Sequence, residues 1–576
     1  MPVPLTTLRS FCLGAAIVLG GASAGTAQDQ SGLAGAFLAA RHASLFNDYS
    51  AAAQYYTRAL ARDSSNPLLL ESALIAFTGL GEVDKAVPIA RRMQSGGIDS
   101  QAAHMVLLAE DVRRGAFDQV IADLDAGRSV GPLVDGLIRA WSHFGAGRMS
   151  EALEAFDAAS AETGLSVFGL YHKGLAFAAV GDFESAEAVL ASDEAQPLLG
   201  TRRGALAHVT TLSQLERNDD AVVLLDEAFG LELDPGLADI RARLVAGETL
   251  PFDTIRNAQD GMAEVFFTVA GALNGDANDG YTLTYARMAE FLHPQHVDAM
   301  LLIAALLESQ ERYTLAVDAY LRVPSGDPAF YAAELGRAEA LRRDGKAEAA
   351  IEVLTQLSKS HAQVPIVHIT LGDMLRRDER FAEATKAYDK AIALLREPSA
   401  AQWVVFYARG ISQERTGDWD KAEADFRKAL ELNPDQPQVL NYLGYSFVEK
   451  RQNLDEALDM IERAVAARPN DGYITDSLGW ILFRLGRYEE AAPHMERAAE
   501  LEPIDPIVND HLGDVLWAVG RKREAEFQWK RALSFVDPDH VPTDLDPDRI
   551  RRKLEIGLDA VLAEEGAEPL KVAKDG

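Results

Sequence analysis

The sequence of 576 residues predicts an all-α fold, a solenoid built from stacked helical hairpins. Two patterns predict this fold. Apolar residues recur three and four positions apart through most of the chain, which is the spacing of amphipathic helices. Small residues also return at one position about every 34 residues, a period that accommodates two helices and a turn. A single hairpin of this length cannot bury its apolar face alone, so neighbouring hairpins must stack.

The first 27 residues have the composition of a secretory signal peptide. Arg9 is followed by an apolar run, Phe11–Gly20, and then by small residues that end at Ala24 or Ala27. The alternative is a membrane anchor, but the run is shorter than the roughly 20 apolar residues that span a bilayer. We therefore expect residues 1–27 to be removed on export and the mature chain to be soluble in the periplasm.

The charge and cysteine content exclude several classes of function. The formal net charge is -32, from 56 basic and 88 acidic residues. Nucleic acid repels such a surface, because phosphate binding needs Lys and Arg. The single cysteine, Cys12, lies in the predicted signal peptide, so the mature chain would contain no disulfide and no thiolate metal site.

The helices are predicted in order from two recurring positions, the first holding small or apolar residues and the second mostly small ones. The first position, represented by Gly479, marks the first helix of each hairpin, at Ala40, Leu74, Leu108, Ala140, Gly174, Val209, Ala270, Ala304, Ala338, Gly372, Gly410, Gly444, Gly479 and Gly513. A second position, twelve or thirteen residues later, marks the second helix, at Ala52, Ala86, Ala152, Ala186, Ala221, Ala316, Ala350, Ala384, Ala422, Ala457, Ala491 and Ala525.

The other recurring residues explain how each hairpin packs and ends. Small residues are needed where two helices cross closely, and bulky ones such as Phe426 fill the gaps beside the crossing. Glycines such as Gly417 and Gly486 mark the turn between the two helices. Prolines such as Pro434 and Pro503 stop the second helix, because proline has no amide hydrogen and clashes with the preceding turn.

These residues resemble the tetratricopeptide repeat. The resemblance is clearest from Phe406-x-x-Arg409-Gly410 to Pro434, and from Leu440-x-x-Leu443-Gly444 to Pro469, and it covers about residues 33 to 535. It implies that the stacked hairpins form a right-handed superhelix with a concave face lined by first helices. The pattern departs from the family at an extra residue in Arg451–Leu454, at four extra residues around 397–402, and in an irregular stretch from Gly230 to Met262.

The irregular stretch suggests a division into two arrays. We predict an N-terminal array at 33–229, a linker or degenerate repeat at 230–262 and a C-terminal array at 263–535. Residues 536–576 would form a connector, a capping helix from about Pro547 to Glu564 and a loose tail. Terminal repeats need such a cap to shield the exposed end of their core.

The sequence contains no motif for catalysis or for a cofactor. It has no phosphate-binding GxxxxGK[ST], no HExxH, no GxSxG and no GxGxxG after a strand. His293 and His296 have a spacing that metal ligands use, but Pro294 separates them at a helix-stop position, which favours a structural role. We expect no enzyme activity, cofactor or metal. The alternative, an enzymatic function located in 230–262, has about 30 residues without His or Cys on which to draw.

The resemblance implies that ligands lie on the concave face, lined by positions 2, 5, 9, 12 and 13 of each repeat. In the last three repeats these positions hold aromatic, acidic and amide residues, which suit a peptide with apolar and basic side chains. The alternative is that the aromatic residues pack between neighbouring first helices or under the capping helix. The family's clamp for a peptide carboxylate needs Lys and Asn, and the matching positions are mostly Asp and aromatic. The predicted partner-binding residues are Asn441, Tyr445, Tyr473, Asp476, Trp480, Phe483, Asp510, Asp514 and Trp517.

Paired arginines form a second candidate surface. Arg342, Arg343, Arg376 and Arg377 end the first helices of two consecutive repeats. Cations at this position favour the negative pole of the helix dipole, which is a sufficient structural reason for them. The functional alternative is a basic strip that binds an acidic peptide or a carboxylate.

These observations together predict a periplasmic scaffold or adaptor that binds peptide or protein partners in its groove. Envelope assembly, export and pilus biogenesis are the processes that we consider. The alternative is a stable structural subunit of an outer-membrane, polysaccharide-export or pilus machine, in peripheral association with a membrane complex.

Overall fold

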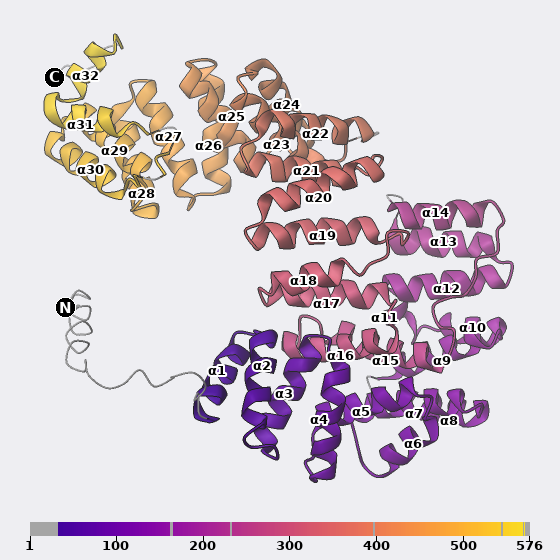
Figure 1. Cartoon of the computed structure of the whole chain (residues 1–576). Helices are drawn as coiled ribbons and strands as arrows, with labels where there is room; N and C mark the ends of the chain where they lie inside the picture. The colour runs from indigo at the N-terminus through magenta and orange to yellow at the C-terminus, as the bar shows by residue number, and fades with distance from the viewer. Residues whose placement is uncertain are drawn as a thin grey trace, which may run out of the picture. The chain divides into compact units, whose positions relative to one another are not determined.

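The computed structural model describes residues 33–161, 165–230, 233–395, 398–538, 540–542, 545–567 and 570. Within these residues the fold is all helical and contains no strand, as the sequence predicts (Figure 1). No helix among them is long and apolar enough to cross a membrane. The predicted signal peptide lies outside the described residues.

The chain divides into two compact units, which we call unit 1 (residues 1–346) and unit 2 (residues 347–576). The helices of unit 1 are α1 (Leu33–Leu45), α2 (Tyr49–Leu60), α3 (Pro67–Gly79), α4 (Val83–Ser95), α5 (Gln101–Arg113), α6 (Phe117–Asp125), α7 (Pro132–Gly145), α8 (Met149–Ser160), α9 (Ser166–Ala179), α10 (Phe183–Leu190), α11 (Gln196–Leu199), α12 (Arg202–Gln214), α13 (Asn218–Phe229), α14 (Pro235–Val245), α15 (Ala258–Leu273), α16 (Asp279–Leu292), α17 (Val297–Ser309), α18 (Tyr313–Tyr320) and α19 (Phe330–Arg343).

Unit 2 continues the pattern of paired helices. Its elements are α20 (Ala347–Ser360), α21 (Pro365–Arg377), α22 (Phe381–Leu394), the short turn η2 (Ala400–Gln402), α23 (Trp403–Arg415), α24 (Trp419–Leu432), α25 (Pro437–Lys450), α26 (Leu454–Ala467), α27 (Gly472–Arg484), α28 (Tyr488–Leu501), α29 (Pro506–Ala518), α30 (Lys522–Phe535), α31 (Pro547–Ile556) and α32 (Leu558–Glu564).

The recurring small residues lie at the helix crossings. Ala422 and Ala457, two of the second-position alanines, are completely buried. A methyl group added at Gly410 would lie 2.7 Å from the ring of Phe426, so the two helices approach too closely for any side chain there. Gly417 and Gly486 have φ values of 83° and 76°, a left-handed conformation that favours glycine at the turn between the helices.

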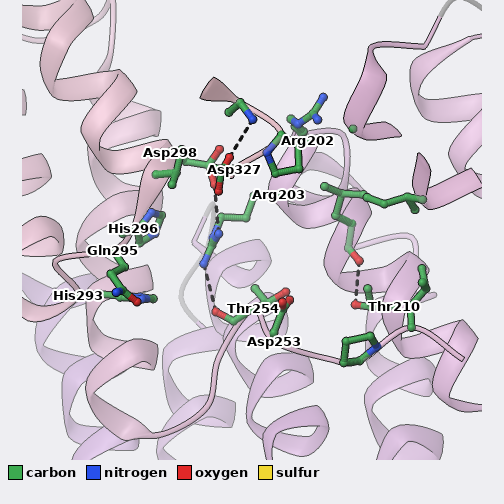
Figure 2. Close-up of a pocket in the computed structure, with 18 of the residues that line it drawn as sticks. Arg202, Arg203, Thr210, Asp253, Thr254, His293, Gln295, His296, Asp298 and Asp327 are labelled. Carbon is green, nitrogen blue, oxygen red and sulfur yellow. Dashed lines mark hydrogen bonds and ion pairs between the residues drawn. The ribbon is translucent and has the colours of Figure 1, made fainter. Parts of the chain in front are cut away.

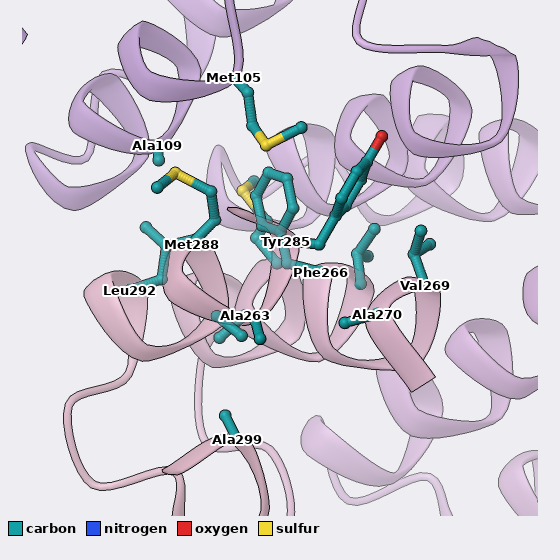
Figure 3. Close-up of a cluster of buried hydrophobic side chains, with 14 of the residues drawn as sticks. Met105, Ala109, Ala263, Phe266, Val269, Ala270, Tyr285, Met288, Leu292 and Ala299 are labelled. Carbon is teal, nitrogen blue, oxygen red and sulfur yellow. The ribbon is translucent and has the colours of Figure 1, made fainter. Parts of the chain in front are cut away.

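Unit 1 folds back on itself, which the repeat pattern does not predict. Helix α15 packs against α7 and α9, and α16 packs against α3 and α5, all of them first helices of the N-terminal hairpins. In Figure 3, Met105 and Ala109 of α5 face Met288 of α16 across one buried cluster. The α15–α16 hairpin therefore covers the face that those first helices share.

The irregular segment contains a helix and an extended connection. Residues 235–245 form α14, and residues 246–257, which are not helical, lead into α15. The predicted boundary at 230–262 therefore lies inside unit 1, whereas the division between the compact units falls between Lys346 and Ala347. The long connection allows α15 and α16 to reach the earlier first helices.

Two helices form the end of unit 2, where the sequence suggested one. Gly557, with φ 82°, separates α31 from α32. A methyl group at this position would lie 2.5 Å from the Trp517 ring of α29, so the chain bends where a side chain would not fit. Leu545, Ile550 and Leu558 are buried in the core of unit 2, consistent with a capping role.

Candidate partner-binding surfaces

The first helices of unit 2 form one candidate surface, which we call the partner face. It consists of the sides of α21, α23, α25 and α27 that carry repeat positions 2, 5, 9, 12 and 13. Three apolar residues at position 2 are strongly exposed: Ile366 by 45%, Val404 by 47% and Tyr473 by 55%. Exposed apolar residues at one position of several hairpins are typical of a binding surface.

Trp480 and Phe483, which the sequence places on this face, are mostly buried. Their rings stack at 5.0 Å, and the other side of Trp480 stacks on His511 of the next first helix at 4.0 Å. The Trp480 indole N–H donates to Glu449 over 2.8 Å. The aromatic pair therefore packs between neighbouring first helices and does not line an open groove.

Asp476 is buried beneath this stack as the partner of His511. Its carboxylate lies 3.0 Å from His511 Nδ1. Burial alone would lower the pKa of His511, but the charge of Asp476 and its hydrogen bond outweigh burial and raise this pKa. Asp476 thus forms a buried structural contact between α27 and α29, and its role in binding a partner stays a prediction.

Asp510, Asp514 and Trp517 are covered by the C-terminal helices. Lys553 of α31 is completely buried, and its ammonium donates to both aspartates over 2.6 Å. The Trp517 indole N–H donates to Asp559 of α32 over 2.8 Å. A basic and apolar ligand was expected at this end of the face. The protein's own helices α31 and α32 lie there instead.

The two remaining predicted residues are half-buried on α25. Asn441 has a buried side-chain oxygen without a hydrogen-bond partner. Tyr445 lies one turn further along the same helix. Together with Tyr473, they are the predicted residues that stay closest to the exposed part of the partner face.

The predicted basic strip is divided between the two units, and Arg342, Arg343 and Arg376 lie beside carboxylates. Arg342 and Arg343 belong to unit 1 and both bind Glu339, at 2.6 and 3.0 Å. Hydrogen bonds from Arg342 lower the pKa of Glu339 to about 2. Arg376, in unit 2 with Arg377, lies 3.5 Å from Asp373. These ion pairs give the arginines a local structural role.

Buried polar contacts hold the fold-back of unit 1 in place. Arg287 of α16 donates to the Gly79 carbonyl at the end of α3, over 3.1 and 3.2 Å. Tyr171 of α9 donates to Glu264 of α15 over 3.0 Å. Removing either partner would leave a buried polar group unpaired, so these contacts favour the packed position of the hairpin.

A cavity of about 370 Å³ lies where the irregular segment meets α12 and α17 (Figure 2). Arg203 crosses it, donating to Glu264 over 2.6 Å, to Asp298 over 3.1 Å and to the Thr254 carbonyl over 3.1 Å. The arginine therefore ties the extended connection to α15 and α17. The hydrogen-bond donors of Arg203 are thus directed at groups of the protein itself.

His293 and His296 border this cavity and have structural contacts. His296 accepts the Ala299 amide through Nδ1, capping α17, and its Nε2 faces Glu264 at 3.4 Å. His293 accepts a hydrogen bond from Arg256. No group of three His, Cys, Asp or Glu side chains in the described part of the chain is arranged to hold a metal ion.

A second cavity of unit 1 lies beside its first hairpins. A cavity of about 420 Å³ is lined by Tyr49, Ile75, Met105 and Tyr281, with Tyr281 from the N-terminal turn of α16. It is the part of the N-terminal first-helix face that the α15–α16 hairpin leaves open. Sequence reasoning did not locate it, because it depends on where the hairpin stops.

Comparisons with known proteins agree with the repeat architecture. The family model described as "Tetratricopeptide repeat" matches residues 335–400 and 407–472, and a second model with the same description matches 476–505. A TPR repeat-containing protein of Pseudomonas aeruginosa is 28% identical over 189 residues, which are 32% of this chain and 31% of the relative. The aspartyl/asparaginyl beta-hydroxylase of Homo sapiens is 26% identical over 157 residues, 26% of this chain and 21% of the enzyme.

The matched stretches thus span less than a third of these curated relatives. Among solved structures, a tetratricopeptide repeat protein from Parabacteroides merdae matches 45% of this chain and 98% of its own, at 17% identity and a TM-score of 0.36. The matches to the family models and the observed helical hairpins lead to the same assignment. The chain is a tetratricopeptide repeat protein.

Proposed function

We propose that this protein is an exported, non-enzymatic adaptor that binds a protein or peptide partner on the partner face of unit 2. Tetratricopeptide repeats generally bind proteins or peptides, and they are typically not catalytic. The observation that carries the proposal is the exposure of Ile366, Val404 and Tyr473 at one position of three first helices. Apolar side chains held at fixed spacing favour a segment that can place matching apolar residues along the face.

The charge of the chain favours a basic partner. With a net charge of -32, the protein attracts cationic segments over long range, and salt weakens this attraction. The partner that we propose therefore combines apolar residues, which contact the face, with Lys or Arg around them.

Export to the periplasm is part of the proposal. It is supported by the order of charged, apolar and small residues in positions 1–27. The expression of the full chain in a bacterium with two membranes, followed by fractionation and N-terminal sequencing, tests it. We expect a periplasmic protein whose first residue is 25 or 28. A cytoplasmic protein that retains Arg9 would contradict it.

The binding experiment uses residues 28–576 as bait for envelope extract. The test variant carries Ile366→Ser, Val404→Ser and Tyr473→Ser. The matched control carries Ile504→Ser, Val541→Ser and Phe527→Ser, because these side chains are exposed by 69%, 44% and 62% outside the partner face. Both variants remove three exposed apolar side chains and should keep the helicity of the parent.

We expect the parent and the control to retain the same protein and the test variant to lose it. Equal retention by all three baits would contradict the proposed face. A partner that stays bound through high salt and co-fractionates with membranes would instead favour a stable structural subunit over an adaptor.

A further inference from the structure

The cavity beside the first hairpins of unit 1 has walls that mix polar groups with apolar surface. Its volume is about 420 Å³, and α3, α5, α16 and the turn between α1 and α2 contribute to its walls. Most of the lining residues carry a hydroxyl, an amide or a carboxylate, and none of them is Lys, Arg or His. Cavities of this size bind small molecules through a few well-placed polar groups. This lining therefore favours a ligand that has no negative charge and many hydrogen-bonding groups.

Three polar side chains at this cavity have no side-chain hydrogen bond or ion pair within the part of the chain that the structure describes. They are Asn47, Glu71 and Ser72, and all three are half-buried. A polar group that is partly shielded from water gains most from a ligand that supplies its missing hydrogen bonds. An amide and a hydroxyl can donate and accept, and a carboxylate accepts, so the hydroxyl groups of a ligand would pair with all three.

An exposed aromatic ring borders the same cavity. Tyr281, in the first turn of α16, is 40% exposed, although its hydroxyl is held by the protein. This hydroxyl lies 2.9 Å from the Tyr285 hydroxyl, and the Gln101 amide donates to it over 3.2 Å. The two contacts fix the orientation of the ring. A fixed aromatic face in contact with water favours a ligand that can lay a flat apolar surface on it.

Two further tyrosines are buried in the wall of the cavity, and their hydroxyls already have partners. Tyr49 donates to Gln310 over 2.7 Å. Tyr56 accepts a hydrogen bond from Ser44 over 3.2 Å. Ile75, which is 42% exposed, adds aliphatic surface. An apolar peptide side chain would fill this space, but it would shield the unpaired polar groups of the wall from water without replacing their hydrogen bonds.

We propose that this cavity binds a short, uncharged saccharide. The C–H face of a sugar ring packs on Tyr281 and Ile75, and the hydroxyl groups at its edge exchange hydrogen bonds with Asn47, Glu71 and Ser72. A sugar hydroxyl both donates and accepts, so one chemical class matches the amide, the carboxylate and the hydroxyl of the wall together. Hydrogen bonds to the charged Glu71 carboxylate are the strongest of these.

The saccharide site is separate from the partner face that the proposed function uses. Its walls come from helices of unit 1, whereas Ile366, Val404 and Tyr473 belong to unit 2. The two sites also differ in ligand chemistry, because the partner face is proposed to bind a basic and apolar protein segment. The saccharide site therefore remains valid if the partner face fails its test, and the reverse also holds.

The experiment titrates residues 28–576 with cellotriose, maltotriose and tri-N-acetylchitotriose, followed by ligand-observed NMR and calorimetry. Sorbitol, which has hydroxyl groups but no ring, and the neutral peptide acetyl-Leu-Gln-Leu-amide are the comparison ligands. We expect at least one trisaccharide to bind about tenfold or more tightly than both, because only a sugar combines a ring face with hydroxyl groups. Added salt should leave this binding almost unchanged, since the ligand carries no charge. The three sugars show whether the cavity prefers plain hexoses or N-acetylated ones.

Variants connect the binding to the cavity. Tyr281→Leu keeps an apolar side chain but removes the ring, and Glu71→Ala removes an acceptor that has no partner in the described structure. Each should weaken binding of the preferred sugar about fivefold or more, with thermal unfolding as the check on folding.

The matched controls change an exposed aromatic residue and an exposed acid away from the cavity. They are Phe527→Leu, where the ring is 62% exposed, and Glu227→Ala. Both controls should bind the sugar as the parent does. The proposal is overturned if no trisaccharide binds, if sorbitol or the peptide binds as tightly, if both cavity variants bind like the parent, or if the controls lose as much.

Discussion

At the scale of single residues, the fold depends on glycine and other small residues at the points where two helices cross. The first helix of a hairpin approaches the second closely enough for Gly410 to contact the completely buried Phe426 ring. Protein interiors are packed densely, so a rigid ring in such a place cannot move aside without disturbing its neighbours. The repeated small residues in the sequence have this physical cause.

Gly410→Ala should destabilise unit 2 by about 1 to 2 kcal/mol, because overpacking outweighs the higher helix propensity of alanine. Gly271→Ala is the matched control, since nothing lies within 4 Å of the added methyl group at that helical position. It should be neutral or slightly stabilising. Urea unfolding of both variants measures the difference, and equal effects would argue against close packing at Gly410.

Arg451→Gly should stabilise unit 2 by up to about 1 kcal/mol, because it removes the left-handed strain of a non-glycine residue. The reverse substitution at the equivalent turn, Gly486→Ala, should destabilise it by about 1 kcal/mol, because Gly486 has φ 76°. Thermal unfolding of the two variants tests the pair. A loss of stability in Arg451→Gly would mean that the side chain is held by contacts within the folded protein.

At the scale of helices, each unit covers part of its own first-helix face. In unit 1 the α15–α16 hairpin lies on α3, α5, α7 and α9. In unit 2, α31 and α32 cover the last first helix through Lys553 and Asp559. These intramolecular contacts decide which part of each face remains for a partner.

His172 makes the fold-back of unit 1 sensitive to acid. It accepts the Trp141 indole N–H over 3.2 Å and contacts Thr268 of α15 at 3.3 Å. Burial lowers the pKa of His172 from 6.5 to about 4. As the pH falls, His172 is protonated in the unfolded chain before it is protonated in the folded one. The stability that neutral His172 contributes is therefore complete above pH 6.5 and is lost as the pH falls toward 4.

In the wild-type protein we expect His172 to lower the free energy of unfolding by roughly 3 kcal/mol between pH 6.5 and pH 4. His172→Gln, which offers similar hydrogen bonds without titrating, should lose less stability than the wild type between pH 7 and pH 4. His42→Gln, at an exposed position, serves as the control. Parallel pH profiles of urea unfolding for wild type and His172→Gln would contradict this role.

Lys553 should be the residue that attaches α31 to unit 2. Lys553→Met leaves Asp510 and Asp514 without their buried ammonium partner, and we expect a loss of about 3 to 5 kcal/mol. Arg551→Met, which changes an exposed side chain that pairs with Asp548 of the same helix, should have no measurable effect. Urea unfolding and hydrogen exchange of α29 measure both; unchanged exchange in Lys553→Met would show that the cap is held by its apolar residues alone.

At the scale of the whole molecule, two compact units each contain their own buried core. The α15–α16 hairpin covers first helices of unit 1, whereas Ile366, Val404 and Tyr473 on first helices of unit 2 are exposed, so we expect the two units to differ in how they bind a partner. Its net charge of -32 adds long-range attraction for cationic partners.

Hydrogen exchange in the presence of the captured partner should show which first helices the partner contacts. We expect slower exchange at the exposed ends of α21, α23 and α27, and unchanged exchange in α3, α5 and α7, because α15 and α16 already cover them. The free protein provides the reference. A footprint on α3 and α5 would instead place the partner at the 420 Å³ opening beside Tyr281.

The helical hairpins, their turns and their small-residue crossings could be predicted from the sequence, because they follow from local periodicity and from contacts between neighbouring segments. The sequence also placed Trp480 and Trp517 on first helices and marked an extra residue within Arg451–Leu454. Which faces of the first helices are covered became known from the three-dimensional fold. The fold-back of α15 on α7 and the burial of Lys553 beside Asp514 join segments far apart in the chain. Such contacts depend on the path of the connecting segments, which residue periodicity does not encode.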